Sequence, residues 1–163
     1  MADQIDYNAI TWPVQLTNEV HRSLYPFLDP SNPSLSATGK SVLITGVSGG
    51  IGRAIAKAWM IAGAKGIAIT GRKTNVLREV EEELRSMSQG RTKVTVLAAD
   101  ITNKEDVERL WAKAEEELGS IDVLINNAGS LNPTRIGQGE PSKWWRGFVR
   151  ANKLIFMSSS DTH

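Results

Sequence analysis

Three glycines in the segment 46–52 have the spacing of a phosphate-binding turn. Gly46, Gly50 and Gly52 follow the apolar run 41–45 and open a helical pattern. In this setting Gly46 permits a tight turn, Gly50 lets the backbone approach a pyrophosphate, and Gly52 lets the helix pack closely on the strand. The free amides and the dipole at the helix N-terminus favour negative charge. A glycine-rich turn needed only for packing is the alternative, but the strand–turn–helix setting favours phosphate binding.

The residues that end the second apolar run indicate which dinucleotide is bound. The sequence there is Thr70-Gly71-Arg72-Lys73, without an acidic side chain. A carboxylate at this point would hydrogen-bond the ribose 2′-hydroxyl of NAD. Arg72 instead offers a planar fork suited to phosphate, and Lys73 adds a second positive charge. Both could simply be charges of a solvated loop, but the missing carboxylate disfavours NAD in either case, and we predict NADP.

A regular alternation of strand and helix patterns from residue 40 onward must position these groups. Four short apolar runs are typical of buried parallel strands, at 41–45, 66–70, 94–99 and 123–126. Helical periodicity follows at 50–62, at 75–88, after a capping box of Thr102 and Glu105, and at 144–157 behind Ser142. The expected core-facing helix positions are Ile51, Ile55, Trp59 and Ala62, then Val76, Val80, Leu84 and Met87, then Val107, Leu110, Trp111, Ala114 and Leu118.

The short connections imply right-handed crossovers and a parallel sheet. We therefore predict an α/β fold, a three-layer, doubly wound parallel sheet of the Rossmann type; the strand order 3-2-1-4 is the one that this topology implies. The sheet is expected to be incomplete, without the strands that would follow the fourth. Residues 123–125 are apolar throughout, as in a strand buried on both faces.

The motifs at these positions resemble those of the short-chain dehydrogenase/reductase family. The match spans residues 40–157: Thr-Gly-x-x-x-Gly-Ile-Gly at 45–52, Asp100 after the third strand, and Asn-Asn-Ala-Gly at 126–129. The resemblance implies an oxidoreductase in which Asp100 contacts the adenine and Asn127 with its neighbours holds the fourth strand beside the cofactor. The expected cofactor-binding residues are Gly46, Ser48, Gly50, Ile51, Gly52, Arg72, Lys73, Asp100, Ile101, Asn127, Ala128 and Gly129.

Residues 1–39 differ from the domain at 40–163, because they hold four prolines and no sustained period. We expect an extended lead-in that wraps the domain surface or stays mobile. The alternative is an arm in which Tyr25, Phe27 and Leu28 dock on a partner or substrate. The pairs His21-Arg22, Tyr25-Pro26 and Leu35-Ser36 resemble reductases of fungal secondary metabolism, which implies a small metabolite as substrate.

Catalysis in this family uses a Tyr with a Lys four residues later, a Ser and an Asn, because the alkoxide formed by hydride transfer must receive a proton. Asn152 lies 25 residues after Asn127, where the family has its Asn. The tyrosines, Tyr7 and Tyr25, precede the domain and have no Lys four residues later. We read Ser158–Ser160 as a frayed end. We therefore expect a chain truncated after the Asn, which binds NADP without turnover. The alternative is a non-catalytic NADP-binding module that acts as a regulator or partner.

The composition limits the remaining possibilities. Hydrophobic residues make up 40% and charged residues 23% of the 163 residues, and the net charge is +1. Nothing resembles the basic stripe of a nucleic-acid-binding protein, and no run approaches the roughly 18 apolar residues of a membrane span. Without cysteine, disulfides and thiolate metal sites are excluded. We expect a cytoplasmic protein that binds a small-molecule metabolite and neither nucleic acid nor membrane. A homo-oligomer is possible, although the interface usual in the family is largely missing.

Overall fold

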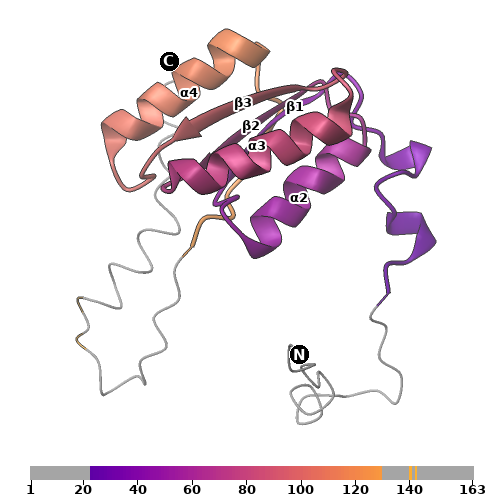
Figure 1. The fold of residues 1–163 in the computed structure, drawn as a ribbon, viewed down its shortest axis with the longest axis horizontal. Helices are drawn as coiled ribbons and strands as arrows, with labels where there is room; N and C mark the ends of the chain where they lie inside the picture. Colours follow the sequence, from indigo (N-terminus) through magenta and orange to yellow (C-terminus); the bar gives the residue numbers. More distant parts are fainter. Residues whose placement is uncertain (1–22, 130–139, 141, 143–163) are drawn as a thin grey trace.

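The computed structural model describes residues 23–129, 140 and 142. In this part of the chain, four parallel strands form one sheet in the order β3-β2-β1-β4, of which Figure 1 labels β3, β2 and β1. This order and the parallel pairing confirm the prediction. The strands are β1 (Ser41–Thr45), β2 (Gly66–Gly71), β3 (Lys93–Ala98) and β4 (Val123–Ile125), and the helices are α2 (Gly50–Ile61), α3 (Thr74–Ser88) and α4 (Lys104–Leu118).

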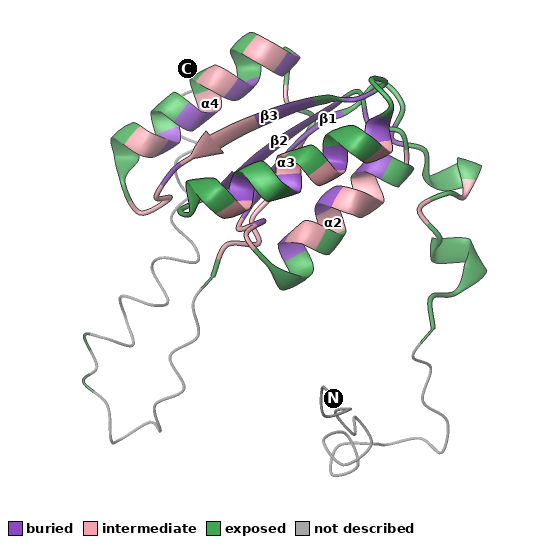
Figure 2. Ribbon diagram, in the orientation of Figure 1, coloured by how far each residue is buried: buried purple, intermediate pink, exposed green. Residues whose placement is uncertain are grey.

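The sheet is the middle of three layers. Helices α2 and α3 cover one face and α4 covers the other (Figure 1). Because successive side chains of a strand point to opposite faces, Val42 and Ile44 pack in the core under α2 and α3, whereas Leu43 packs under α4. The buried residues of each helix lie on the side that faces the sheet (Figure 2). Burial on both faces explains why β1 is apolar almost throughout.

The strand register brings the functional segments together. Strand β1 pairs with β2, with Thr45 opposite Thr70, and on its other side with β4, with Ile44 opposite Ile125. Since all four strands are parallel, their carboxyl ends reach the same edge of the sheet. The glycine turn, the Arg72 loop, the Asp100 loop and the Asn-Asn-Ala-Gly segment all start from this edge.

The buried face of α2 differs from the prediction. Ile51 is 72% exposed, and the buried residues are Gly52, Ala56 and Met60, while Ile55, Trp59 and Ala62 are only partly buried. The face is shifted because small residues let the helix approach the strands. A Cβ on Gly52 would lie 2.5 Å from the carbonyl oxygen of Gly46. Periodicity of large apolar residues could not reveal this close approach.

Helix α3 and the strand ends differ from the predictions by small amounts. Val80 and Leu84 are buried as predicted, but Leu77 is buried in place of the partly buried Val76, and Met87 is also only partly buried. Strand β2 extends to Gly71, and β3 starts one residue earlier than predicted. Strand β4 ends at residue 125 and is only partly buried, as expected of an apolar strand at the edge of the described sheet.

The predicted capping box at the start of α4 is wrong. The N-cap is Asn103, whose Oδ1 accepts a hydrogen bond of 2.9 Å from the backbone N–H of Asp106. Thr102 instead donates its hydroxyl to Asp100 Oδ1 at 2.8 Å. Both Thr and Asn are good N-caps, so the sequence alone did not separate the two positions. The predicted core positions of α4 are buried, apart from the partly buried Trp111.

The described part of the lead-in contains two short 3₁₀ helices, η2 (Pro26–Leu28) and η3 (Pro33–Leu35). Phe27 is 70% exposed, and the segment joins the domain where the Ala37 amide donates to the Ala62 carbonyl oxygen at 2.8 Å. Ser142 is exposed. The predicted helix at 144–157 lies outside the described residues, as do Asn152, the terminal serines and Tyr7.

Candidate functional site

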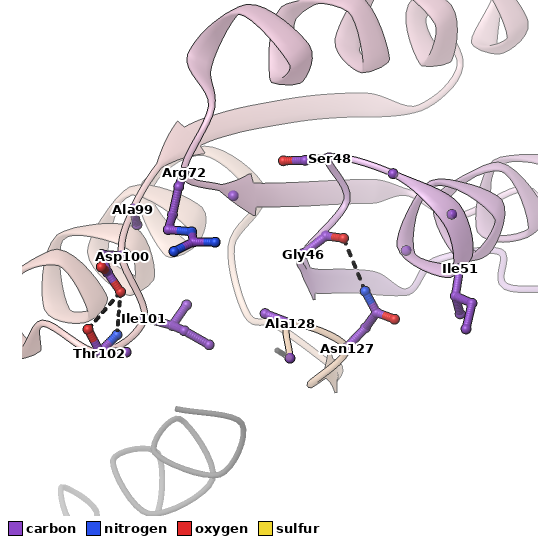
Figure 3. A pocket seen from close by; sticks show the side chains of 15 residues that line it. Gly46, Ser48, Ile51, Arg72, Ala99, Asp100, Ile101, Thr102, Asn127 and Ala128 are labelled. Carbon is purple, nitrogen blue, oxygen red and sulfur yellow. Dashed lines mark hydrogen bonds between the residues drawn. The ribbon is translucent and has the colours of Figure 1, made fainter. Parts of the chain in front are cut away.

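A cleft of about 500 Å³ opens at the carboxyl edge of the sheet (Figure 3). This volume lies within the range of roughly 300–1,000 Å³ that is usual for small-molecule and cofactor sites. Segments that follow each of the four strands line it: Gly46, Ser48, Gly49, Gly50, Ile51 and Gly52; Gly71 and Arg72; Ala99, Asp100, Ile101 and Thr102; and Asn127, Ala128 and Gly129. The cleft is where doubly wound folds bind their ligands, outside the strand ends at the point where strand order reverses.

The three glycines of the turn have different surroundings. A Cβ on Gly46, whose φ is +73°, would lie 2.7 Å from the Ala128 Cα, so this glycine allows two backbone segments to touch. Gly52 does the same for the helix and the turn. Gly50 has a φ of +50°, and a Cβ there would have no neighbour within 4 Å. Gly50 therefore faces open space at the start of α2, where the helix presents unpaired amides.

Thr45 and Asn127 join the glycine turn to the end of β4. The Thr45 Oγ1 accepts hydrogen bonds from the backbone N–H groups of Asn127 and Ala128, at 3.1 and 3.0 Å. The Asn127 Nδ2 donates to the carbonyl oxygens of Thr45 and Gly46, at 3.0 and 3.1 Å. Figure 3 shows the second of these bonds at the wall of the cleft. These bonds fix the wall formed by residues 127–129 against the turn.

Arg72 extends from the end of β2 into the cleft (Figure 3). It is exposed, and it has neither a hydrogen bond nor an ion pair within residues 23–129. The neighbouring Gly71 leaves room for Ser48, since a Cβ on Gly71 would lie 2.5 Å from the Ser48 Oγ. Lys73 is exposed at the N-cap of α3 and does not line the cleft. A guanidinium beside a hydroxyl forms a donor set suited to phosphate.

Asp100 lies on the same side of the cleft as Arg72, in the loop after β3 (Figure 3). Its Oδ1 accepts from the N–H and the hydroxyl of Thr102, at 2.9 and 2.8 Å. Its carbonyl oxygen accepts from the Asn103 N–H at 2.9 Å, which closes a turn. These hydrogen bonds therefore orient the carboxylate within its own turn.

The structure brings together eleven of the residues proposed from the sequence as cofactor ligands, all except Lys73. Asn152 lies outside the described residues. The sequence-based set lacks Gly49, Gly71, Ala99 and Thr102, which line the same cleft. Each is next to, or two residues from, a proposed residue. Extending each motif by one or two positions would have included them.

The resolved pKa shifts belong to groups outside the cleft. The pKa of Glu83 is lowered, chiefly by its hydrogen bond to Lys57 and then by the one to Arg53, at 2.7 Å. Arg53 is in the first turn of α2, but this ion pair directs it toward α3. Among the described residues, no group of His, Cys, Asp and Glu is arranged to hold a metal ion. The charged group that the cleft offers to an anion is therefore Arg72.

A family model described as short chain dehydrogenase matches residues 40–159. The chain belongs to the short-chain dehydrogenase family. This confirms the resemblance seen in the sequence and makes the chain a member of an oxidoreductase family. Within the described residues, no helix has the length and apolar character needed to cross a membrane.

Individual relatives cover most of this chain. The short chain dehydrogenase pigC of Monascus ruber is 35% identical over 136 residues, 80% of this chain and 44% of that protein. The short chain dehydrogenase tazN of Aspergillus terreus is 31% identical over 80% of this chain and 28% of its own length. The structure of L-sorbose reductase from Gluconobacter frateurii, complexed with NADPH and L-sorbose, matches with a TM-score of 0.65 and 30% identity, over 74% of this chain and 46% of that chain. The chain thus spans less than half the length of these relatives.

Proposed function

We propose that the chain binds NADP(H) in the cleft at the carboxyl edge of the sheet. Hydride transfer between this cofactor and a carbonyl or alcohol group of a small metabolite would also need a Tyr with a Lys four residues later, which this 163-residue sequence does not hold, so we assign to it cofactor binding without turnover. The family membership supports a nicotinamide cofactor, and the neighbour solved with NADPH shows that this cofactor occurs among similar structures. The choice of NADP over NAD rests on the chain's own residues.

Arg72 is the observation that carries this choice. It is exposed in the cleft, and no described residue engages its guanidinium. No acidic residue lies between Thr70 and Lys73 to bind a ribose 2′-hydroxyl or to repel a phosphate. A guanidinium forms strong, often bidentate hydrogen bonds with phosphate. Arg72 is therefore assigned to the 2′-phosphate, with the Ser48 hydroxyl beside it.

The rest of the cleft fits the other parts of the dinucleotide. Gly50 leaves open space at the N-terminus of α2, where the amides and dipole favour the pyrophosphate. Asp100, which lies on the same side of the cleft as Arg72, is assigned to the adenine. Residues 127–129 form the opposite wall, on the side of the nicotinamide. When bound, the cofactor supplies the hydride, and the residues described here bind and orient it.

The test is a titration of NADPH and NADH into the wild-type chain, Arg72→Ala and Arg78→Ala. Arg78 is an exposed arginine of α3 outside the cleft and serves as the control. Hydrogen bonds to a charged group contribute about 1.5–3 kcal/mol, so Arg72→Ala should weaken NADPH binding about 10- to 100-fold. NADH binding and the Arg78→Ala variant should change little. Equal affinities of the wild-type chain for the two cofactors would contradict the assignment of NADP.

A further inference from the structure

We infer that Asp106, a residue of α4 outside the cleft, is a positioning residue for adenine recognition by Asp100. The inference rests on the proposed function, in which Asp100 contacts the adenine. The Asp106 Oδ2 accepts a hydrogen bond of 2.8 Å from the backbone N–H of Asp100. Asp106 does not line the cleft, so its effect on a bound cofactor must pass through Asp100.

The contact differs from ordinary capping of a helix. In a capping box, the acidic side chain of the first turn reaches back to the backbone N–H of the N-cap residue. Here the N-cap Asn103 accepts from the Asp106 N–H, but the Asp106 carboxylate reaches past Asn103 to the amide of Asp100, six residues earlier. The contact therefore holds the residue that faces the cleft rather than the helix end.

The other contacts of Asp106 make it a rigid support. Its Oδ1 accepts from Arg109 Nη2 at 2.8 Å, so each carboxylate oxygen has a partner. The next residue, Val107, is buried, and Leu110, one turn further on, belongs to the apolar cluster between α4 and the sheet. The Asp100 backbone is thus tied through one side chain to a helix whose position is set by the core.

The hydrogen bonds within the Asp100 loop hold the Asp100 carboxylate, but they do not fix the loop to the rest of the domain. The bonds from Thr102 to Oδ1 and from Asn103 to the carbonyl oxygen lie within residues 100–103. They orient the carboxylate relative to its own turn. The Ala99 N–H donates to the Gly71 carbonyl oxygen at 3.0 Å, which ties the start of the loop to β2, and the bond from Asp106 ties the next amide to α4. Without the Asp106 bond, the loop keeps its tie to β2 but loses the one to α4, so the position of the Asp100 carboxylate in the cleft is less closely fixed.

The test compares two ligands that differ in one group of the base. NADPH has the 6-amino group of adenine, which donates to a carboxylate, whereas reduced nicotinamide hypoxanthine dinucleotide phosphate has an oxygen there. The affinities of both are measured for the wild-type chain, Asp106→Ala and Glu105→Ala. Glu105 is an exposed acid of the same helical turn, so its variant controls for lost helix-dipole stabilisation. The readout is the ratio of the two affinities, which uniform weakening of the fold leaves unchanged.

The wild-type chain and Glu105→Ala should prefer NADPH by about tenfold or more, because a charge-assisted hydrogen bond is lost with the analogue. In Asp106→Ala, the preference should fall below about threefold. If Asp106→Ala does not fold, Asp106→Ser replaces it, because its hydroxyl is one bond shorter and cannot reach the Asp100 amide. A variant that keeps the full preference would overturn the inference. A wild-type chain that binds both ligands equally would overturn it while leaving NADP binding intact, and one that binds neither would overturn the proposed function as well.

Discussion

The two sides of the cleft are held in different ways. On the side of β1 and β4, Thr45 and Asn127 are 82 residues apart in sequence, and reciprocal hydrogen bonds join them. On the side of β2 and β3, the Asp100 carboxylate is held by a residue two positions away, and Arg72 has no partner among the described residues. The first side depends on the complete fold, whereas the second is set mainly by local turns. Substitutions on the first side should therefore reduce stability, and those on the second should change ligand preference.

The largest effect is expected for Gly46→Ala, on the β1–β4 side. The new Cβ would lie 2.7 Å from the Ala128 backbone, and the residue has a φ of +73°. Overpacking costs about 1–3 kcal/mol and left-handed backbone about 1–2 kcal/mol more, so the free energy of unfolding should fall by about 2–5 kcal/mol. Urea denaturation measures it. Gly39→Ala is the control, because its φ is +79° but no atom lies within 4 Å of the added Cβ. Equal losses of stability in the two variants would show that backbone strain, and not the contact with Ala128, causes the loss.

The next largest loss of stability is expected when a threonine hydroxyl is removed, and one such hydroxyl lies on each side of the cleft. Thr45→Val removes the acceptor of two backbone N–H groups, those of Asn127 and Ala128. Leaving buried donors unpaired costs about 1–3 kcal/mol each when fully desolvated. Because these amides are only partly buried, we expect a loss of about 2–3 kcal/mol. The Thr70 hydroxyl donates a single bond of 2.7 Å to the Leu97 carbonyl oxygen, so Thr70→Val should cost about 1 kcal/mol. A loss in Thr70→Val as large as that in Thr45→Val would remove the distinction between the two sides.

The sequence predicts the strands and the positions of the motifs because these depend on local patterns. Residues 41–45 form β1 within the predicted bounds, since a short apolar run ended by glycine has few other solutions in an α/β domain. The strand order also followed, because the family pattern implies it. The glycine turn and the residues after β2 and β3 meet in one cleft because parallel strands share a carboxyl edge.

The sequence predicts the close packing at Gly52, but it does not predict which face of α2 this packing buries, nor the features that depend on side-chain direction. The buried face of α2 was misplaced because Gly52 and Ala56, which have little or no side chain, bring the helix nearest the sheet. The cap of α4 was misplaced by one residue because Thr102 and Asn103 are both competent caps. The bond from Asp106 to the Asp100 amide has no signature of its own, since an acid in the first turn of a helix is common.

A smaller effect, on affinity rather than stability, is expected at Gly50. A Cβ there would enter open space at the N-terminus of α2, where we place the pyrophosphate. Gly50→Ala should weaken NADPH binding by about tenfold or more, which corresponds to about 1.4 kcal/mol. Gly90→Ala is the control, because its φ of +79° is equally unfavourable and its Cβ also meets no atom within 4 Å, but it lies outside the cleft. Similar NADPH affinities in the two variants would mean that the phosphates bind elsewhere.

The smallest effect on stability is expected at Glu83, which joins α3 to α2. Helix α2 follows the glycine turn, and α3 follows the Arg72 loop. The Glu83 carboxylate accepts from Lys57 and Arg53 of α2, at 2.5 and 2.7 Å, and these bonds lower its pKa. A carboxyl with a lowered pKa in the folded state stabilises the protein above its unfolded pKa of about 4.3, and this contribution is lost as the pH falls through the folded value. Glu83→Gln should therefore reduce the free energy of unfolding at pH 7 by less than about 1 kcal/mol, as is usual for solvent-screened pairs.

The same measurement at about pH 3 should give a smaller difference between Glu83→Gln and the wild-type chain, because the wild-type carboxyl takes up protons as the pH falls toward its lowered folded pKa. Glu82→Gln, an exposed position of the same helix without an ion pair among the described residues, should match the wild-type chain at both pH values. A stability difference for Glu83→Gln that is unchanged between the two pH values would show that the side chain acts through packing and not through charge. The helices that follow the glycine turn and the Arg72 loop, α2 and α3, would then be joined by apolar packing and not by the ion pairs of Glu83.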